Sequence, residues 1–142
     1  MSDWERVETN PHQDHVIAHV LGASVLGYFV WDETAYLLLD IGFIWNIYLD
    51  GEMGLVPQAQ AVNELSADSS LKSQIRNDVD AITMGVTAAV LGKMIIPNFI
   101  SPIQTVELFA RDNSRRLMLT CEEATLVVET SLSTGEVKVY EF

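Results

Sequence analysis

Two long apolar runs, residues 16–31 and 35–49, dominate the first third of the chain, and only the tripeptide Asp32-Glu33-Thr34 separates them. Both runs are shorter than the roughly 20 residues that a membrane-spanning helix needs, and neither has basic flanks that would orient it in a bilayer. We therefore expect no membrane association. We expect both runs to be buried, as strands or as a helix, in the core of a folded protein.

Length and composition are those of one folded domain. The chain has 142 residues, of which 49% are hydrophobic. A chain of this size can bury a core without disulfide bonds or a structural metal. No internal repeat or long linker divides it, so we expect a single domain over residues 1–142.

The start of the first apolar run has two interpretations. Asn10-Pro11 is a typical helix start, because Asn favours the N-cap and Pro the first helical position, and apolar residues then recur with a helical period. The alternative is one strand over residues 16–31 that pairs with a return strand over 35–49. We favour a helix near residues 11–22, followed by strands from about residue 24. Residues 1–9 are polar, and we expect them to be loose or peripheral.

The longest helical pattern lies in the middle of the chain. Apolar residues repeat there every three or four positions, at Leu71, Ile75, Val79, Ile82, Val86 and Ala89-Val90. This spacing places one continuous apolar stripe along a helix. Ser66 or Asp68 can cap its start and Gly92 suits its end, although Gly85 is a point at which the helix can break. The sequence predicts one long central helix.

Hairpins are predicted on both sides of this helix. Residues 36–49 have the composition of a strand, Asp50-Gly51 is a hairpin turn signal, and residues 53–56 can return before Pro57 ends the pairing. The C-terminal third alternates turns with short predicted strands, over residues 103–110, 116–121, 125–130 and 136–142. We expect an α+β fold, in which an antiparallel sheet with a hairpin-rich N-terminal half and a C-terminal meander packs on the central helix.

The charge of the chain is strongly acidic. There are 20 acidic and 8 basic residues, a net charge of -12, and no lysine or arginine occurs between Arg6 and Lys72. Such a surface repels phosphate backbones and anionic lipids, so we expect no nucleic-acid partner. A cation or a basic partner fits better, although high acidity alone also keeps a protein soluble.

Cys121 is the only cysteine, which excludes an internal disulfide bond and the usual cysteine-rich zinc sites. The N-terminus is acidic and lacks the apolar segment of a secretory signal. We therefore expect a cytoplasmic protein. Cys121 falls on the apolar face of a predicted strand, where a thiol is more often inert packing than a nucleophile.

All three histidines fall within one short segment, at His12, His15 and His19. Offsets of three and four place them on one face of a helix, where they could bind zinc or another divalent metal together with a carboxylate or water. Asp40, which interrupts an apolar run, is a candidate for that carboxylate. The pattern lacks the glutamate of the His-Glu-x-x-His motif, and structural or solvated histidines are the more common interpretation of such a cluster.

Aromatic residues crowd the two apolar runs. Four of them, Trp31, Phe43, Trp45 and Tyr48, are expected to contribute to an interaction surface or a pocket. Burial in the core is the default role, but apolar residues occupy both faces of these predicted strands, and one covering layer hides only one face. The pattern favours self-association, with an apolar ligand pocket as an alternative.

No catalytic motif is present. The sequence lacks a phosphate-binding loop, a dinucleotide-binding fingerprint and the Gly-x-Ser-x-Gly nucleophile elbow. We therefore expect a small acidic protein that is not an enzyme and acts by protein–protein association, as a homodimer or with another protein. The alternative is a metal-binding protein or metal-dependent hydrolase that uses His12, His15 and His19. A weaker alternative is a carrier of an apolar small ligand.

Overall fold

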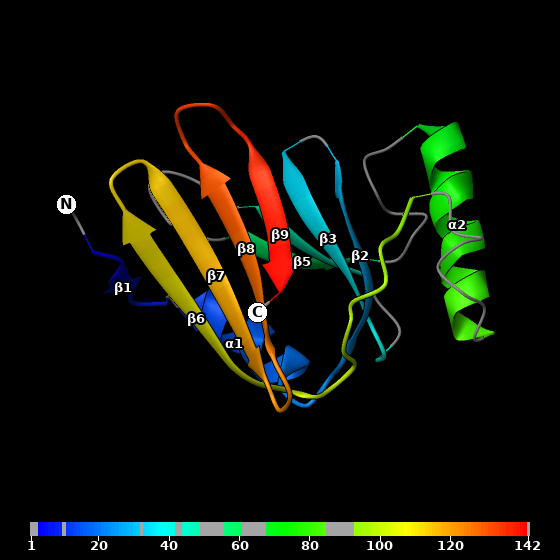
Figure 1. Cartoon of the computed structure of the whole chain (residues 1–142), viewed down its shortest axis with the longest axis horizontal. Coiled ribbons are helices and arrows are strands. Elements are labelled where there is room, and N and C mark those ends of the chain that lie inside the picture. Colours follow the sequence, from blue (N-terminus) through cyan, green and yellow to red (C-terminus); the bar gives the residue numbers. More distant parts are fainter. Residues whose placement is uncertain are drawn as a thin grey trace.

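Two antiparallel sheets and two helices form the part of the chain that the computed structural model describes (Figure 1). The described residues are 3–9, 11–31, 33–41, 44–48, 56–60, 68–84 and 93–141, with the backbone alone described at His12, Tyr48 and Val56–Gln60. The helices are α1 (Pro11–Val20) and α2 (Ser69–Thr83). The strands are β1 (Glu5–Val7), β2 (Val25–Trp31), β3 (Thr34–Leu39), β4 (Ile44–Tyr48), β5 (Val56–Gln60), β6 (Ile103–Arg111), β7 (Ser114–Cys121), β8 (Thr125–Ser131) and β9 (Val137–Glu141).

Each sheet consists of antiparallel neighbours. One sheet has five strands in the order β1-β6-β7-β8-β9, and the other has four in the order β2-β3-β4-β5. The predicted C-terminal meander is confirmed as β6 to β9. Strand β1 was not predicted: this polar segment pairs with the edge of β6, with Val7 opposite Leu108.

The main core lies between the two sheets. Alternate residues of β3 and β4, such as Leu37 and Trp45, belong to one cluster with alternate residues of β7 and β8, such as Leu117 and Val128. All four side chains are fully buried. Because side chains alternate along a strand, each of these sheets has one face in this core and a second face that must be covered or exposed.

Helix α2 lies outside this core. Its buried residue Ile75 packs with Phe29, Tyr36 and Leu38 on the second face of the four-stranded sheet. Figure 1 shows α2 on the far side of β2 and β3 from the five-stranded sheet. The prediction of one long central helix is therefore wrong. The apolar stripe exists, but it covers one face of a sheet whose other face already packs on a second sheet.

The ends of α2 follow from capping. The side chain of Asp68 accepts the N–H of Leu71 at 2.7 Å, as expected for an N-cap. The helix ends at Thr83, with Met84 as the C-cap. Residues 85–92, over which the helix was predicted to continue, lie outside the described residues. Neither α1 nor α2 is long and apolar enough to cross a membrane.

The N-terminal half corrects several predictions. The helix near residues 11–22 is confirmed as α1, so the alternative of one long strand is wrong. The strand predicted over residues 36–49 is two strands, β3 and β4, with a turn between them. Pro57 lies within β5, opposite Ile47, instead of ending a strand. Proline is tolerated because β5 is an edge strand, where one side of the backbone needs no partner. The predicted turn at Asp50-Gly51 lies outside the described residues.

Candidate functional site

The histidine cluster lies on α1. His15 and His19 are exposed, and their rings meet edge to face, with centroids 4.7 Å apart and planes at 85°. The side chain of His12 lies outside those described. Among the described side chains, no group of three His, Cys, Asp or Glu residues could hold a metal ion. The three-histidine site therefore stays a prediction.

Asp40 has a local structural role. It is exposed in the turn that follows β3, where its Oδ1 accepts the N–H of Ser24 at 3.1 Å. Its own N–H donates to the carbonyl of Ser24 at 3.0 Å. The two hydrogen bonds fix the β3–β4 turn to the start of β2. In the described part of the chain, Asp40 does not join His15 and His19 in a ligand group.

The four aromatic candidates do not form one surface among the described residues. Trp45 is fully buried between the sheets, and its Nε1 has no hydrogen-bond partner there. Trp31 is half-buried and packs with the α2 cluster on the opposite face. Phe43 and the side chain of Tyr48 lie outside the described residues. Both faces of the four-stranded sheet are thus covered within one chain, which accounts for apolar residues on both faces without a second copy.

Cys121 is not placed for nucleophilic chemistry. It is buried in β7, and burial raises the pKa of its thiol, an effect that a hydrogen bond with Ser101 partly opposes. A thiol with a raised pKa is protonated at neutral pH, and the thiolate is the reactive form.

A cationic and aromatic stack on the five-stranded sheet was not predicted. Two guanidinium groups lie over the indole of Trp4, with the Cζ atoms of Arg111 and Arg116 at 4.5 and 4.0 Å from its ring centroid. An arginine over an indole face is an attractive cation–π arrangement. Together with the ion pair of Arg6 and Glu107 at 3.6 Å, the stack fixes the N-terminal segment to β6 and β7.

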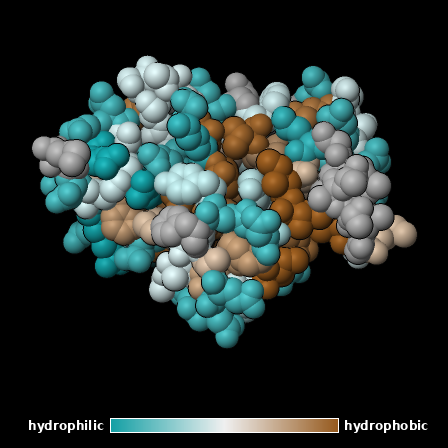
Figure 2. Space-filling view, in the orientation of Figure 1, coloured by the Kyte–Doolittle hydropathy of each residue, from teal (hydrophilic) through white to brown (hydrophobic). Residues whose placement is uncertain are grey.

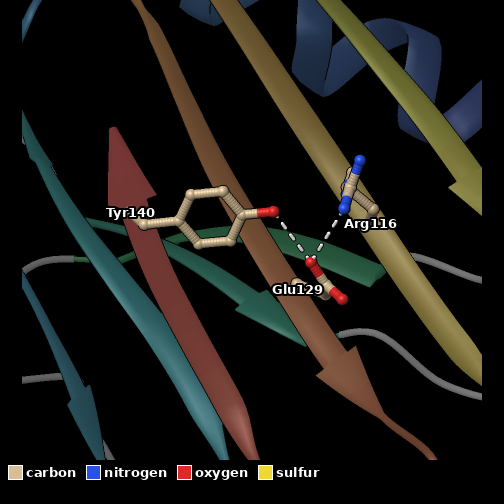
Figure 3. A network of polar contacts seen from close by, with 3 residues as sticks. All are labelled: Arg116, Glu129 and Tyr140. Atoms are coloured by element: carbon tan, nitrogen blue, oxygen red, sulfur yellow. Dashed lines mark hydrogen bonds and ion pairs between the residues drawn. The ribbon is translucent and has the colours of Figure 1, made fainter. Parts of the chain in front are cut away.

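Arg116 also begins a polar network across three strands. Its Nη2 lies 3.1 Å from Oε2 of Glu129, and the hydroxyl of Tyr140 donates to the same oxygen at 2.8 Å (Figure 3). Burial raises the pKa of Tyr140 most, and the hydrogen bond to Glu129 raises it further. The hydroxyl is therefore protonated and donates at neutral pH. The network links β7, β8 and β9 on the face of the sheet opposite to the core.

Two exposed apolar residues lie in the segment beside β2. Ile95 and Ile100 are 54% and 55% exposed. The N–H and carbonyl of Ile95 pair with Tyr28 of β2 at 2.8 and 2.9 Å, so this segment lies along the strand. Figure 2 shows hydrophobic residues gathered in a band over β2, β9 and this segment. We call Val30, Ile95, Ile100 and Val139 the apolar strip.

A small cavity opens within the strip. Its volume is about 260 Å³, and it is lined by Tyr28, Phe29, Val30, Lys93, Ile95 and Val139. We call this cavity the β2–β9 slot. Among the described residues that line it, five are apolar or aromatic and Lys93 is charged. An apolar pocket with a single polar group is a typical small-ligand site.

A larger cavity of about 660 Å³ lies between β1, α1 and β6. Its charged lining residues are mostly engaged with neighbours, because Arg6 pairs with Glu107 and Thr9 hydrogen-bonds to Asp14. It does not present a convergent set of free polar groups.

Comparison of the chain with protein-family models, curated proteins and solved structures found no match.

Proposed function

We propose that the protein is a non-catalytic module that associates with a second copy of itself through the apolar strip. The exposure of Ile95 and Ile100, each above one half, is the observation that supports this most directly. Single exposed apolar side chains are common on proteins, but a band of hydrophobic residues such as that of Figure 2, beside a cavity, is typical of a binding surface. The surface differs from the aromatic residues on which the sequence-based expectation rested.

The charge of the chain favours self-association at this place. With a net charge of -12, two copies repel each other over most approaches. Between Asp80 and Glu107 the sequence has no acidic residue, and its only charged residue is Lys93. The segment that carries Ile95 and Ile100 therefore adds no carboxylate of its own to such an interface, although the carboxylate of Glu141 accepts a hydrogen bond from its Asn98.

The size of the strip implies a weak dimer. Burying the exposed half of an isoleucine is worth about 1 kcal/mol, and specific interfaces bury at least about 1,000 Å² in total. Four aliphatic side chains supply only part of that area. We expect a dissociation constant of roughly 10–500 µM, because association must also offset the lost freedom of two molecules.

Sedimentation velocity over a concentration series tests the proposal. The native chain is expected to shift from the mass of one chain to that of two as concentration rises, and Ile95→Glu and Ile100→Glu are expected to stay monomeric. Met84→Glu is the matched control, because Met84 is 84% exposed at the end of α2 and lies outside the strip. A native chain that stays monomeric up to about 1 mM, above the expected dissociation constant, contradicts the proposal, as does equal dissociation by the control.

A further inference from the structure

We infer that the β2–β9 slot binds a small apolar carboxylic acid, with its carboxylate on Lys93 and its apolar body between Val30, Ile95 and Val139. The slot shares Val30, Ile95 and Val139 with the apolar strip, so ligand binding and self-association would use one surface, but the slot calls for a ligand of defined chemistry. Three features of the described residues support it: the size and lining of the slot, the fixed backbone that carries Lys93, and the charge of that lysine.

The volume of the slot limits the ligand. About 260 Å³ accommodates roughly ten non-hydrogen atoms, if each needs about as much space as a water molecule in the liquid, roughly 30 Å³ or slightly less. This is smaller than a typical drug-sized site and fits one phenyl or branched aliphatic group with a short acid chain. The aliphatic side chains of Val30, Ile95 and Val139 provide the contacts such a group prefers.

The backbone around Lys93 is held from two directions. The buried carboxylate of Asp78 accepts the N–H groups of Lys93 and Met94 at 2.6 and 2.8 Å. One residue further, Ile95 pairs with Tyr28 through both of its backbone groups. The base of the lysine is therefore positioned before a ligand arrives, and less ordering remains to be done on binding.

The charge of Lys93 is available to a ligand. In the described part of the chain, the ion pairs are those of Arg6, Arg116 and Lys138, and Lys93 is in none of them. The carboxylate of Glu141 forms no ion pair with Lys93, and its oxygens accept the N–H of Asn98 at 2.7 Å and the hydroxyl of Tyr28 at 3.4 Å. An anion gains from the lysine, a neutral ligand gains little, and a cation is repelled.

The test uses 3-phenylpropionate and its uncharged amide as probes, followed by amide shifts in nitrogen–proton correlation spectra. The acid is expected to shift Val30, Ile95 and Val139 with a dissociation constant of about 0.1–1 mM, given its size. Lys93→Met is expected to weaken binding of the acid at least about tenfold, as for loss of a charged hydrogen bond. Binding of the amide is expected to stay unchanged. Lys138→Met is the matched control, since Lys138 is an exposed lysine of β9 that does not line the slot.

Equal binding of acid and amide overturns the inference, and so does an absence of shifts at about 10 mM, well above the expected constant. The same titration on Ile100→Glu, which does not line the slot, separates ligand binding from self-association: shifts that persist in a monomeric variant support the slot independently. N-acetyl-glycyl-phenylalanine presents the same chemistry at the end of a peptide. Tighter binding of this peptide assigns the slot to a chain terminus, and tighter binding of the free acid assigns it to a small metabolite.

Discussion

The carboxylate of Asp78 accepts the backbone N–H of Met94 at 2.8 Å, joining α2 to the segment that runs along β2. Asp78 is 3% exposed and lies on the same helical face as Ile75 and Ile82, where an apolar residue is expected. The position is acidic because two backbone N–H groups of the following segment need an acceptor there. A buried unsatisfied N–H costs more than the net gain from one hydrogen bond.

Replacement of Asp78 is expected to destabilise the fold. Asp78→Ala leaves the N–H groups of Lys93 and Met94 without an acceptor, at about 1–3 kcal/mol for each buried group, so we expect a loss of about 2–4 kcal/mol in the free energy of unfolding. Urea denaturation measures this loss in the free energy of unfolding. Asp80→Ala on the exposed side of α2 is the control and is expected to change stability by less than about 0.5 kcal/mol. Equal effects of the two variants would contradict the role assigned to Asp78.

The ion pair between Arg116 and Glu129 is expected to contribute measurably. The two side chains are 20% and 24% exposed, and their atoms are 3.1 Å apart. A double-mutant cycle with Arg116→Met and Glu129→Gln should give a coupling energy of about 0.5–1.5 kcal/mol, because partial burial weakens solvent screening.

The pair of Lys138 and Glu136 provides the comparison for this cycle. The two side chains are 65% and 60% exposed, and Nζ of Lys138 lies 3.8 Å from Oε1 of Glu136. The coupling energy of this pair should be close to zero. In addition, Arg116→Met alone should lower the free energy of unfolding more than Glu129→Gln alone, since Arg116 also stacks on Trp4. Similar coupling energies for the two pairs would mean that the network of Figure 3 adds no stability.

Local signals in the sequence predicted the elements better than their arrangement. Asn10-Pro11 marked the start of α1, and Asp68 capped α2. The position of α2 could not be read in the same way, because an apolar stripe has the same spacing whether it faces a central core or the outer face of a sheet. Likewise, apolar residues on both faces of β3 and β4 suggested a dimer, whereas α2 and the five-stranded sheet cover them within one chain.

The candidate site depended on contacts that sequence spacing does not encode. The slot joins β2, the segment after α2 and β9, which are far apart in the chain. Trp4 meets Arg111 and Arg116 only because β1 pairs with β6. One local signal was available for Asp78: a carboxylate three residues after Ile75 and four before Ile82 falls on the apolar stripe and therefore needs buried donors.

The thiol of Cys121 is expected to be inert in the folded protein. It is buried, and burial raises its pKa, so both access and thiolate fraction are low at neutral pH. Reaction with a disulfide reagent such as Ellman's reagent should be slow in buffer and fast in concentrated urea, with one thiol per chain. Complete labelling of the native protein within seconds would show that β7 exposes this residue.

Stability is expected to fall at alkaline pH through two tyrosines. Burial raises the pKa of Tyr28 and of Tyr140, and the carboxylates of Glu141 and Glu129 add to the effect. The unfolded-state pKa is about 10, so the folded state holds these protons more tightly. This contribution is fully present below pH 10 and is lost as the pH rises through the higher folded-state pKa values.

The free energy of unfolding, measured in urea between about pH 8 and 12 on either side of that reference, should therefore decline in the native chain. Tyr28→Phe and Tyr140→Phe should each flatten the decline, and the double variant should flatten it further, because phenylalanine has no proton to lose. A decline as steep in the double variant as in the native chain would assign the alkaline loss to other groups.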